Sequence, residues 1–317
     1  MLGFLKKLLG LEAANRLIAP GTLGLEELAR RLGVSERDLQ STGISYSVFH
    51  VSKRTGGTRT ISAPAAELKA MQRRILHRLL RRLKAHPCAT GFERGHSIVS
   101  NALPHARQQI IIKLDIRDFF NSIPALRIEN FFRAIGWNAE AAALLTQLCT
   151  HDGSLPQGAP TSPRLSNLVN YRLDSRLFAL AQFRGLAYSR YADDLTFSGS
   201  DTNATSAPRI NPKTLESLER PAGRINDVIH AAKMILADEG YALHTEKKLR
   251  IARRHDRQIV TGLVVNEKVQ LPRRTRRRLR AAEHRLRTTG AATLSQQQLR
   301  GWRALQNMIS VQAAPAP

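Results

Sequence analysis

Two short stretches of the sequence carry the acidic residues best placed for metal-dependent chemistry. Asp115 follows the apolar run from Ile110 to Leu114, and Asp193 and Asp194 close the tetrad Tyr191-Ala192-Asp193-Asp194. The run predicts a buried strand, and the residues around the tetrad predict a hairpin with both acids at its bend. If the two strands are neighbours, three carboxylates converge and can hold two divalent ions about 4 Å apart for phosphoryl transfer onto a nucleic-acid 3′ end. Mg²⁺ is the expected ion because it prefers oxygen ligands, with Mn²⁺ as the alternative.

The net charge of the chain indicates a polyanionic partner. Its 317 residues include 49 Lys and Arg against 25 Asp and Glu, a formal charge of +24 that exceeds what solubility requires. Nucleic acid and an anionic membrane are the two candidates, but no apolar run is long enough to span a bilayer. The two cysteines, Cys88 and Cys149, indicate neither a zinc site nor a disulfide framework. We therefore expect a cytoplasmic nucleic-acid-binding protein with no membrane partner.

Hydrophobic periodicity and turn signals predict the elements that position the acids. Met1 to Gly10 has the apolar spacing of an amphipathic helix and lacks the order of a signal peptide. Residues 25 to 40 predict two short helices that break near Gly33, either a packed helical hairpin or half of a helix-turn-helix. The other predicted elements are a hairpin over 47–64, a basic helix over 67–83, helices over 139–148 and 222–238, a strand over 259–265 and an arginine-dense helix after Pro272.

Six stretches in order give the chain a family resemblance from residue 48 to residue 266. They are KRTGGTRTISAP, KLDIRDFF, LPQGAPTSPRLSN, YADD, GYALHTEKK and IVTGLVVN. Together they resemble reverse transcriptases, whereas the tetrad alone is a weak signal. The resemblance implies an α+β right-hand polymerase with fingers, a palm of antiparallel sheet plus helices, and a basic helical thumb. The implied domains are an N-terminal helical extension at 1–46, fingers at 47–112, a palm at 113–266 with a fingers insertion near 122–155, and a thumb and tail at 267–317.

The resemblance also implies roles in the active site. Asp115, Asp193 and Asp194 would bind two Mg²⁺ ions, and Ile116 would contribute its backbone carbonyl. Phe120 falls where the family places an aromatic ring against the sugar 2′ position, which favours dNTPs over ribonucleotides. Because adjacent residues of an extended chain face opposite sides, one of the pair Phe119 and Phe120 is expected in the core.

Four positions resemble nucleotide-binding residues: Lys53, Arg59, Gln157 and Lys247. The two cations before residue 60 are expected to grip the triphosphate, as an ammonium and a forked guanidinium can, and Arg54 is an alternative to the lysine. The glutamine opens the segment lining the nucleotide pocket, next to Gly158, where glycine permits close backbone approach. Lys247 matches a lysine proposed to protonate the leaving pyrophosphate, with a plain electrostatic or structural role as the alternative and Lys248 beside it.

Two further signatures are similar to the retron reverse transcriptases of bacteria: Asn101-Ala102-Leu103-Pro104-His105 and Val260-Thr261-Gly262. Asn101 and His105 lie four residues apart, on one face of a helical turn, and are expected to bind RNA unless they are a capping Asn and a surface His. Val260, Thr261 and Gly262 are either RNA-binding residues or a simple strand and bulge. The thumb residues expected to contact RNA phosphates are Arg273, Arg274, Arg276, Arg277, Arg278 and Arg280.

A retron-like enzyme implies a specific set of partners. These are a cognate structured noncoding RNA, copied from a guanosine 2′-hydroxyl, the RNA-linked DNA product, dNTPs, and a separate effector protein held in check within an antiphage system of the bacterial cytoplasm. The alternatives are another bacterial reverse transcriptase, of the group II intron, abortive-infection or CRISPR-associated kind, or a basic RNA-binding scaffold. The residues after Gly262 suffice for a thumb but not for a maturase or endonuclease domain.

Overall fold

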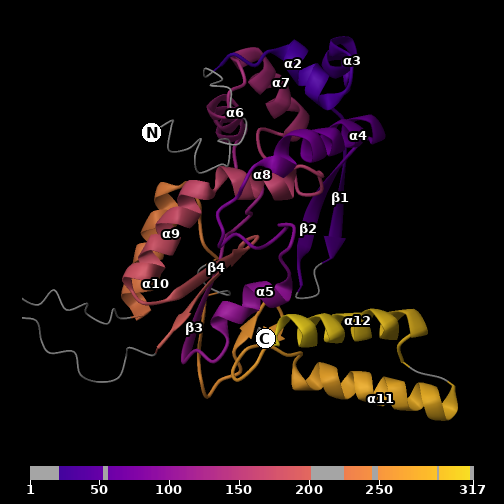
Figure 1. Cartoon of the computed structure of the whole chain (residues 1–317), viewed down its shortest axis with the longest axis vertical. Helices are drawn as coiled ribbons and strands as arrows, with labels where there is room; N and C mark the ends of the chain where they lie inside the picture. Colours follow the sequence, from indigo (N-terminus) through magenta and orange to yellow (C-terminus); the bar gives the residue numbers. More distant parts are fainter. Residues whose placement is uncertain (1–20, 53–55, 201–224, 245–248, 291–292, 315–317) are drawn as a thin grey trace, which may run out of the picture. The chain divides into compact units, whose positions relative to one another are not determined.

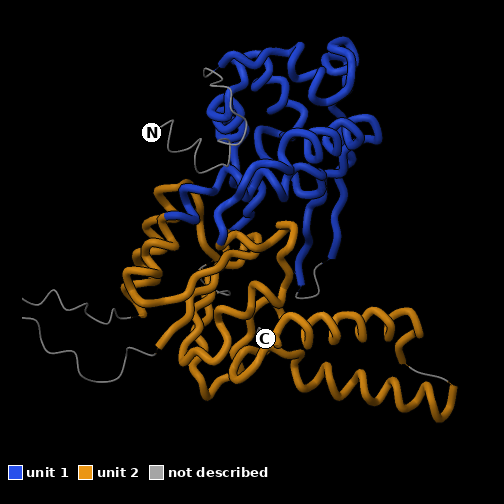
Figure 2. Tube along the Cα trace, viewed as in Figure 1, with its two compact units in different colours: residues 1–87, 117–175 blue, residues 88–116, 176–317 orange. Residues whose placement is uncertain are grey.

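A computed structural model of the chain describes residues 21–52, 56–200, 225–244, 249–290 and 293–314. Two compact units make up the chain (Figure 2): unit 1 holds residues 1–87 and 117–175, and unit 2 holds residues 88–116 and 176–317. The boundaries expected for fingers, palm and thumb stay predictions, and the helix expected over Met1 to Gly10 lies outside the described residues. Among the helices of the described ranges, none is long and apolar enough to cross a membrane.

Unit 1 contains the predicted helix pair near the N-terminus. Helix α2 (Leu25–Leu32) ends at Gly33, and α3 (Glu36–Ser41) begins after Ser35, whose side chain accepts a hydrogen bond from the Asp38 backbone N–H. The apolar side of α2 is buried inside the unit, so it packs as a helical hairpin does. The predicted break between the two helices is confirmed.

A hairpin and a basic helix follow. Strands β1 (Tyr46–Ser52) and β2 (Thr58–Pro64) pair antiparallel, as predicted. The single helix predicted over 67–83 is wrong in its second half: α4 (Ala66–Arg74) passes into a π-helical turn η2 (Ile75–Leu79) and a 3₁₀ turn η3 (Leu80–Arg82). The Arg164 side chain donates to the carbonyl oxygens of Leu80 and Leu83, so the carbonyls at this end of the helix find partners outside it.

The rest of unit 1 is helical. Its helices are α6 (Ala125–Ala134), α7 (Ala139–Cys149), which confirms the prediction over 139–148, and α8 (Ser162–Val169). The buried Gln72 side chain of α4 donates to the Tyr46 hydroxyl and to the Leu148 carbonyl, both at 2.8 Å, and so joins β1 to α7. Helix α9 (Tyr171–Phe183) runs from unit 1 into unit 2.

Unit 2 is built on a four-stranded antiparallel sheet. Its strands are β3 (Ile110–Asp115), β4 (Ala187–Tyr191), β5 (Asp194–Gly199) and β6 (Arg250–Arg253), in the order β4-β5-β3-β6. The predicted strand at residue 110 and the predicted hairpin around the tetrad are confirmed. A mixture of helices and antiparallel sheet is what the α+β prediction requires.

Short elements and three long helices complete unit 2. They are α5 (Ile98–Ala102), η4 (Leu103–His105), α10 (Ile225–Asp238), the hairpin of β7 (Ile259–Val260) and β8 (Leu263–Val264), α11 (Arg273–Thr289) and α12 (Gln296–Gln312). Helices α11 and α12 lie side by side (Figure 1), joined by an ion pair of 2.8 Å between Arg303 and Glu283. One core cluster connects this helix pair to α5, the β7–β8 hairpin and Ile111 of β3.

The single strand predicted over 259–265 is wrong. The chain reverses at Thr261 and Gly262, which have φ of 45° and 82°, so two very short strands pair across a tight turn. A positive φ is unusual for a β-branched residue. Thr261 keeps it while its hydroxyl donates to the Ile98 carbonyl at 2.8 Å.

Candidate active site

The predicted catalytic aspartates meet at one end of β3 and β5. Asp115, the last residue of β3, is directly opposite Asp194, the first residue of β5. Directly opposed residues point to the same face, and their Cα atoms are about 5 Å apart. Asp193 lies in the adjoining turn, where its carbonyl accepts from the Ile116 backbone N–H at 3.0 Å. The structure thus brings the aspartates and Ile116 together, while their metal-binding roles stay predictions.

The turn that carries Asp193 is contacted by Arg190 and Gly91, two residues that the sequence did not single out. Ala192 has φ of 58°, and its carbonyl accepts from the Arg190 guanidinium at 3.2 Å. Gly91 lies against this turn so closely that a Cβ added there would be 2.7 Å from the Ala192 nitrogen. Glycine is therefore required at this contact. One glycine in a single sequence gives no signal of such a role.

A lysine and a histidine lie beside the carboxylates. Lys113 of β3 has its ammonium 3.7 Å from an Asp194 oxygen, and His244 has Nε2 3.8 Å from an Asp115 oxygen. His244 is fixed there because its backbone N–H donates to the Asp115 carbonyl at 3.0 Å. Alternation along β3 places Lys113 on the same face as Asp115, a relation that was available from the sequence. The position of His244 beside Asp115 could not be predicted from the sequence.

The donor set at this site fits a hard divalent cation in an open site. The predicted ligands, carboxylate oxygens and the Ile116 backbone carbonyl, are of the kind that Mg²⁺ takes. Among the described residues, no three or more His, Cys, Asp or Glu side chains are grouped closely enough to hold a metal ion by themselves, and this includes the three aspartates. Water and nucleotide phosphates would complete the coordination, as is usual for Mg²⁺ in nucleotidyl transfer.

The predicted nucleotide-binding residues that the structure describes lie in unit 1. Phe119 is buried and Phe120 is half-buried, so the expectation that one of this pair belongs to the core is confirmed. The Gln157 carbonyl accepts from the Ser62 N–H of β2 at 2.8 Å, and a Cβ at Gly158 would be 2.8 Å from the Ser62 carbonyl oxygen. This contact joins the predicted pocket segment to the hairpin that carries Arg59. Lys53 and Lys247 lie outside the described residues.

Asn101 and His105 lie in the interior of unit 2, at 1% and 0% exposure. Asn101 is in α5, and its side-chain oxygen accepts from the Thr90 hydroxyl at 2.6 Å. His105 ends η4, and its two ring nitrogens contact the Ser198 and Ser189 hydroxyls at 2.7 and 2.8 Å. Burial, and then the positive charge of Lys113, lowers the pKa of His105 to about 4. Neither side chain is accessible to RNA in this conformation, and His105 is not the surface residue of the alternative interpretation.

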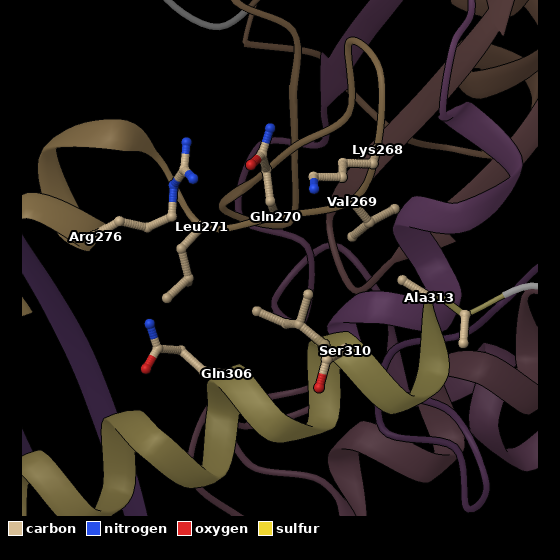
Figure 3. Close-up of a pocket in the computed structure, with 10 residues that line it drawn as sticks. Lys268, Val269, Gln270, Leu271, Arg276, Gln306, Ser310 and Ala313 are labelled. Atoms are coloured by element: carbon tan, nitrogen blue, oxygen red, sulfur yellow. The ribbon is translucent and has the colours of Figure 1, made fainter.

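The remaining RNA-binding candidates lie in α11 and in the β7–β8 hairpin. Val260 is buried, Thr261 is half-buried and Gly262 is exposed at the tip of its hairpin. Of the six predicted arginines in α11, five are exposed and Arg276 is half-buried. Arg276 lines a pocket of about 380 Å³ between α11, α12 and residues 268–271, together with Lys268, Gln270 and Gln306 (Figure 3).

Comparison with known proteins gives the family. The family model described as reverse transcriptase (RNA-dependent DNA polymerase) matches residues 51–250. The chain belongs to the reverse transcriptase family. Among its relatives, the retron Mx65 reverse transcriptase of Myxococcus xanthus is 38% identical over 82% of this chain and 62% of its own. The retron Mx162 enzyme of the same organism is 36% identical (89% and 63% covered), and the retron Ec86 enzyme of Escherichia coli is 34% identical (81% and 74%).

These relatives confirm the resemblance to retron reverse transcriptases that the sequence motifs indicated. The chain spans less than two thirds of the length of the two Myxococcus relatives. A telomerase structure from Candida albicans, in complex with a fragment of telomeric RNA, matches 79% of this chain and 51% of its own, with a TM-score of 0.47 and 10% identity. That likeness is too distant to bear on function.

Proposed function

We propose that this chain is an RNA-directed DNA polymerase that copies part of a cognate structured RNA into RNA-linked DNA. The observation that carries the proposal is the register of β3 and β5, in which Asp115 is directly opposite Asp194 on one face of the sheet. A pair of carboxylates so arranged beside Asp193 is the donor set that nucleotidyl transfer requires. Membership of the reverse transcriptase family, with named retron relatives, supports RNA as the template.

The aspartates and Ile116 would hold two Mg²⁺ ions, with Mn²⁺ as a substitute, and these ions would activate the primer hydroxyl and stabilise the leaving pyrophosphate. The Lys113 ammonium, 3.7 Å from an Asp194 oxygen, balances part of the negative charge of the carboxylates. This arrangement lowers the repulsion that clustered carboxylates would otherwise suffer.

Selection and binding of the dNTP are assigned to other residues. Phe120 presents a ring to the sugar 2′ position, and Arg59 with Lys53 grips the triphosphate. The Gln157 backbone, bonded to β2, holds the pocket segment next to that hairpin. Lys247 protonates the pyrophosphate.

The RNA is bound by the thumb. The exposed arginines of α11 and the tip of the β7–β8 hairpin contact the phosphates of a folded RNA stem. The positive charge of α11 is offset by a single acid, Glu283. A separate effector protein, controlled by the enzyme and its RNA–DNA product, and an antiphage role in the bacterial cytoplasm complete the proposal. They rest on the retron relatives.

Co-expression of the chain with the noncoding DNA that flanks its gene tests the proposal. Purified wild-type protein should carry DNA covalently linked to RNA, and Asp194→Asn should reduce that DNA at least about 100-fold. Asp227→Asn, the same change at an exposed position of α10, is the matched control and should retain the product. Equal DNA from wild type and Asp194→Asn would refute the proposed site, and copurifying RNA without DNA from the wild type would favour an RNA-binding scaffold.

A further inference from the structure

We propose that Asn101 and His105 are positioning residues that hold the catalytic turn Ala192–Asp193 in place, and that neither residue contacts RNA. The proposal rests on the polymerase function proposed above and assigns these residues a place in its machinery. Both side chains are buried and bonded to the β4–β5 hairpin or to the segment beside it. Two contacts carry the inference.

The first contact is made by His105, which bridges the two strands of the catalytic hairpin. Its ring nitrogens lie 2.8 Å from the Ser189 hydroxyl of β4 and 2.7 Å from the Ser198 hydroxyl of β5. The register pairs Ser189 with Thr196, and alternation then puts both serines on the face that carries Asp194. A neutral imidazole has one donor and one acceptor nitrogen, so it can bond both hydroxyls. His105 thus fixes one strand against the other on the catalytic face.

The second contact is made by Asn101 through the residues Cys88–Gly91, here called the edge strap. The strap runs beside β4: Ala89 forms a parallel bridge with Arg190, the Thr90 N–H donates to the Arg190 carbonyl at 2.9 Å, and the Arg190 N–H donates to the Cys88 carbonyl at 2.8 Å. The Thr90 hydroxyl donates to Asn101 at 2.6 Å. The same buried hydroxyl lies 3.2 Å from the Arg190 carbonyl, so it joins Asn101 to β4.

The edge strap ends directly on the catalytic turn. Gly91 abuts the backbone of Tyr191 and Ala192, with no room for a Cβ. A shift of the strap therefore shifts the turn, because close-packed backbones transmit displacement. Asp193 is part of this turn and Asp194 follows it directly, so Asn101 and His105 control the position of both carboxylates.

Helix α5 connects this support to the thumb. The Ile98 carbonyl at its start accepts from the Thr261 hydroxyl of the β7–β8 turn at 2.8 Å, and the Ser97 hydroxyl donates to the Gln312 side chain of α12 at 2.5 Å. Val99 and Ala102 of α5 belong to the core cluster of α11 and α12. Helix α5 therefore contains Asn101 of one retron-like signature and contacts Thr261 of the other. Through these contacts a movement of α11 and α12 would displace the catalytic turn.

Single-turnover dNTP incorporation on an RNA template, at saturating RNA and nucleotide, tests the proposal together with RNA affinity. Thr90→Val removes the hydroxyl bonded to Asn101, and His105→Phe removes both serine contacts at similar volume. Each should lower the maximal incorporation rate about 10- to 100-fold and change RNA affinity less than about threefold. Thr90→Ser keeps the hydroxyl and should restore the rate to within about threefold of wild type. Thr146→Val, which removes a buried hydroxyl in α7, is the matched control and should keep the rate.

Hydrogen exchange at the amides of residues 191–195 provides a second readout that needs no catalysis. Protection there should fall about tenfold or more in Thr90→Val and His105→Phe, while Thr146→Val leaves it unchanged. A drop in RNA affinity with an unchanged rate at saturating RNA would overturn the proposal in favour of direct RNA binding. Unchanged protection would also overturn it. If the wild type makes no DNA while protection falls as expected, the proposed function fails and the positioning role stands.

Discussion

The burial of His105 makes the stability of the protein depend on pH in a predictable way. The pKa of this imidazole falls from its ordinary value of 6.5 to about 4 in the folded chain. Between these values the unfolded chain binds a proton that the folded chain does not, so stability falls as the pH falls. The contribution of His105 is complete above about pH 6.5 and is lost progressively toward pH 4. At about pH 5 the loss is about 2 kcal/mol relative to about pH 7.5.

Urea unfolding of wild type and His105→Gln at a series of pH values isolates this effect. A glutamine can bond the two serine hydroxyls but does not titrate, so the free energy of unfolding of wild type should drop about 2 kcal/mol more than that of the variant between about pH 7.5 and pH 5. His284→Gln, on an exposed side of α11, is the control and should follow the wild-type curve. Parallel curves for wild type and His105→Gln would show that the imidazole is not held neutral by burial.

Three further outcomes follow from the structure. Gly91→Ala places a Cβ against the catalytic turn. Because a misplacement of about 1 Å costs about 100-fold in rate, RNA-templated incorporation should fall about 100-fold while RNA affinity is retained. An unchanged rate would contradict the close contact between Gly91 and the turn. Gln72→Met removes two buried hydrogen bonds and should lower the free energy of unfolding by about 1–3 kcal/mol in urea titrations, and no loss would contradict its bridging role. Replacing exposed thumb arginines by Ala should reduce the salt slope of RNA affinity by about one unit for each residue, whereas Arg30→Ala, paired with Glu27 in unit 1, should not; the replacements are Arg273, Arg277 and Arg280.

Local patterns predicted the elements that carry the catalytic acids. The apolar run that ends at Asp115 was sufficient to predict β3, and the strand-forming residues around the tetrad were sufficient to predict the β4–β5 hairpin. Both predictions were possible because a buried strand appears in the sequence as a short apolar run. The register that sets Asp115 opposite Asp194 joins segments far apart in the chain. Only the structure, or the family resemblance, could provide it.

Tertiary contacts explain what the sequence did not predict. The basic helix over 67–83 has helical periodicity throughout, yet its second half is a π turn followed by a 3₁₀ turn, and the Arg164 side chain donates to the Leu80 and Leu83 carbonyls at its end. The run over 259–265 is apolar and β-branched, yet it turns at Thr261, whose hydroxyl finds the Ile98 carbonyl. Asn101 and His105 were polar residues on one face of a turn, and only packing shows that this face is buried.

RNA-templated primer extension by the purified chain, in Mg²⁺ and with dNTPs, tests the central claim most directly. Wild type and the control Asp227→Asn should synthesise DNA. Asp115→Asn and Asp194→Asn should each lose at least about 100-fold in rate, with RNA affinity unchanged, because the carboxylates act on the reacting phosphates and not on RNA binding. DNA synthesis at the wild-type rate by either variant would contradict the claim that these two opposed aspartates form the polymerase active site.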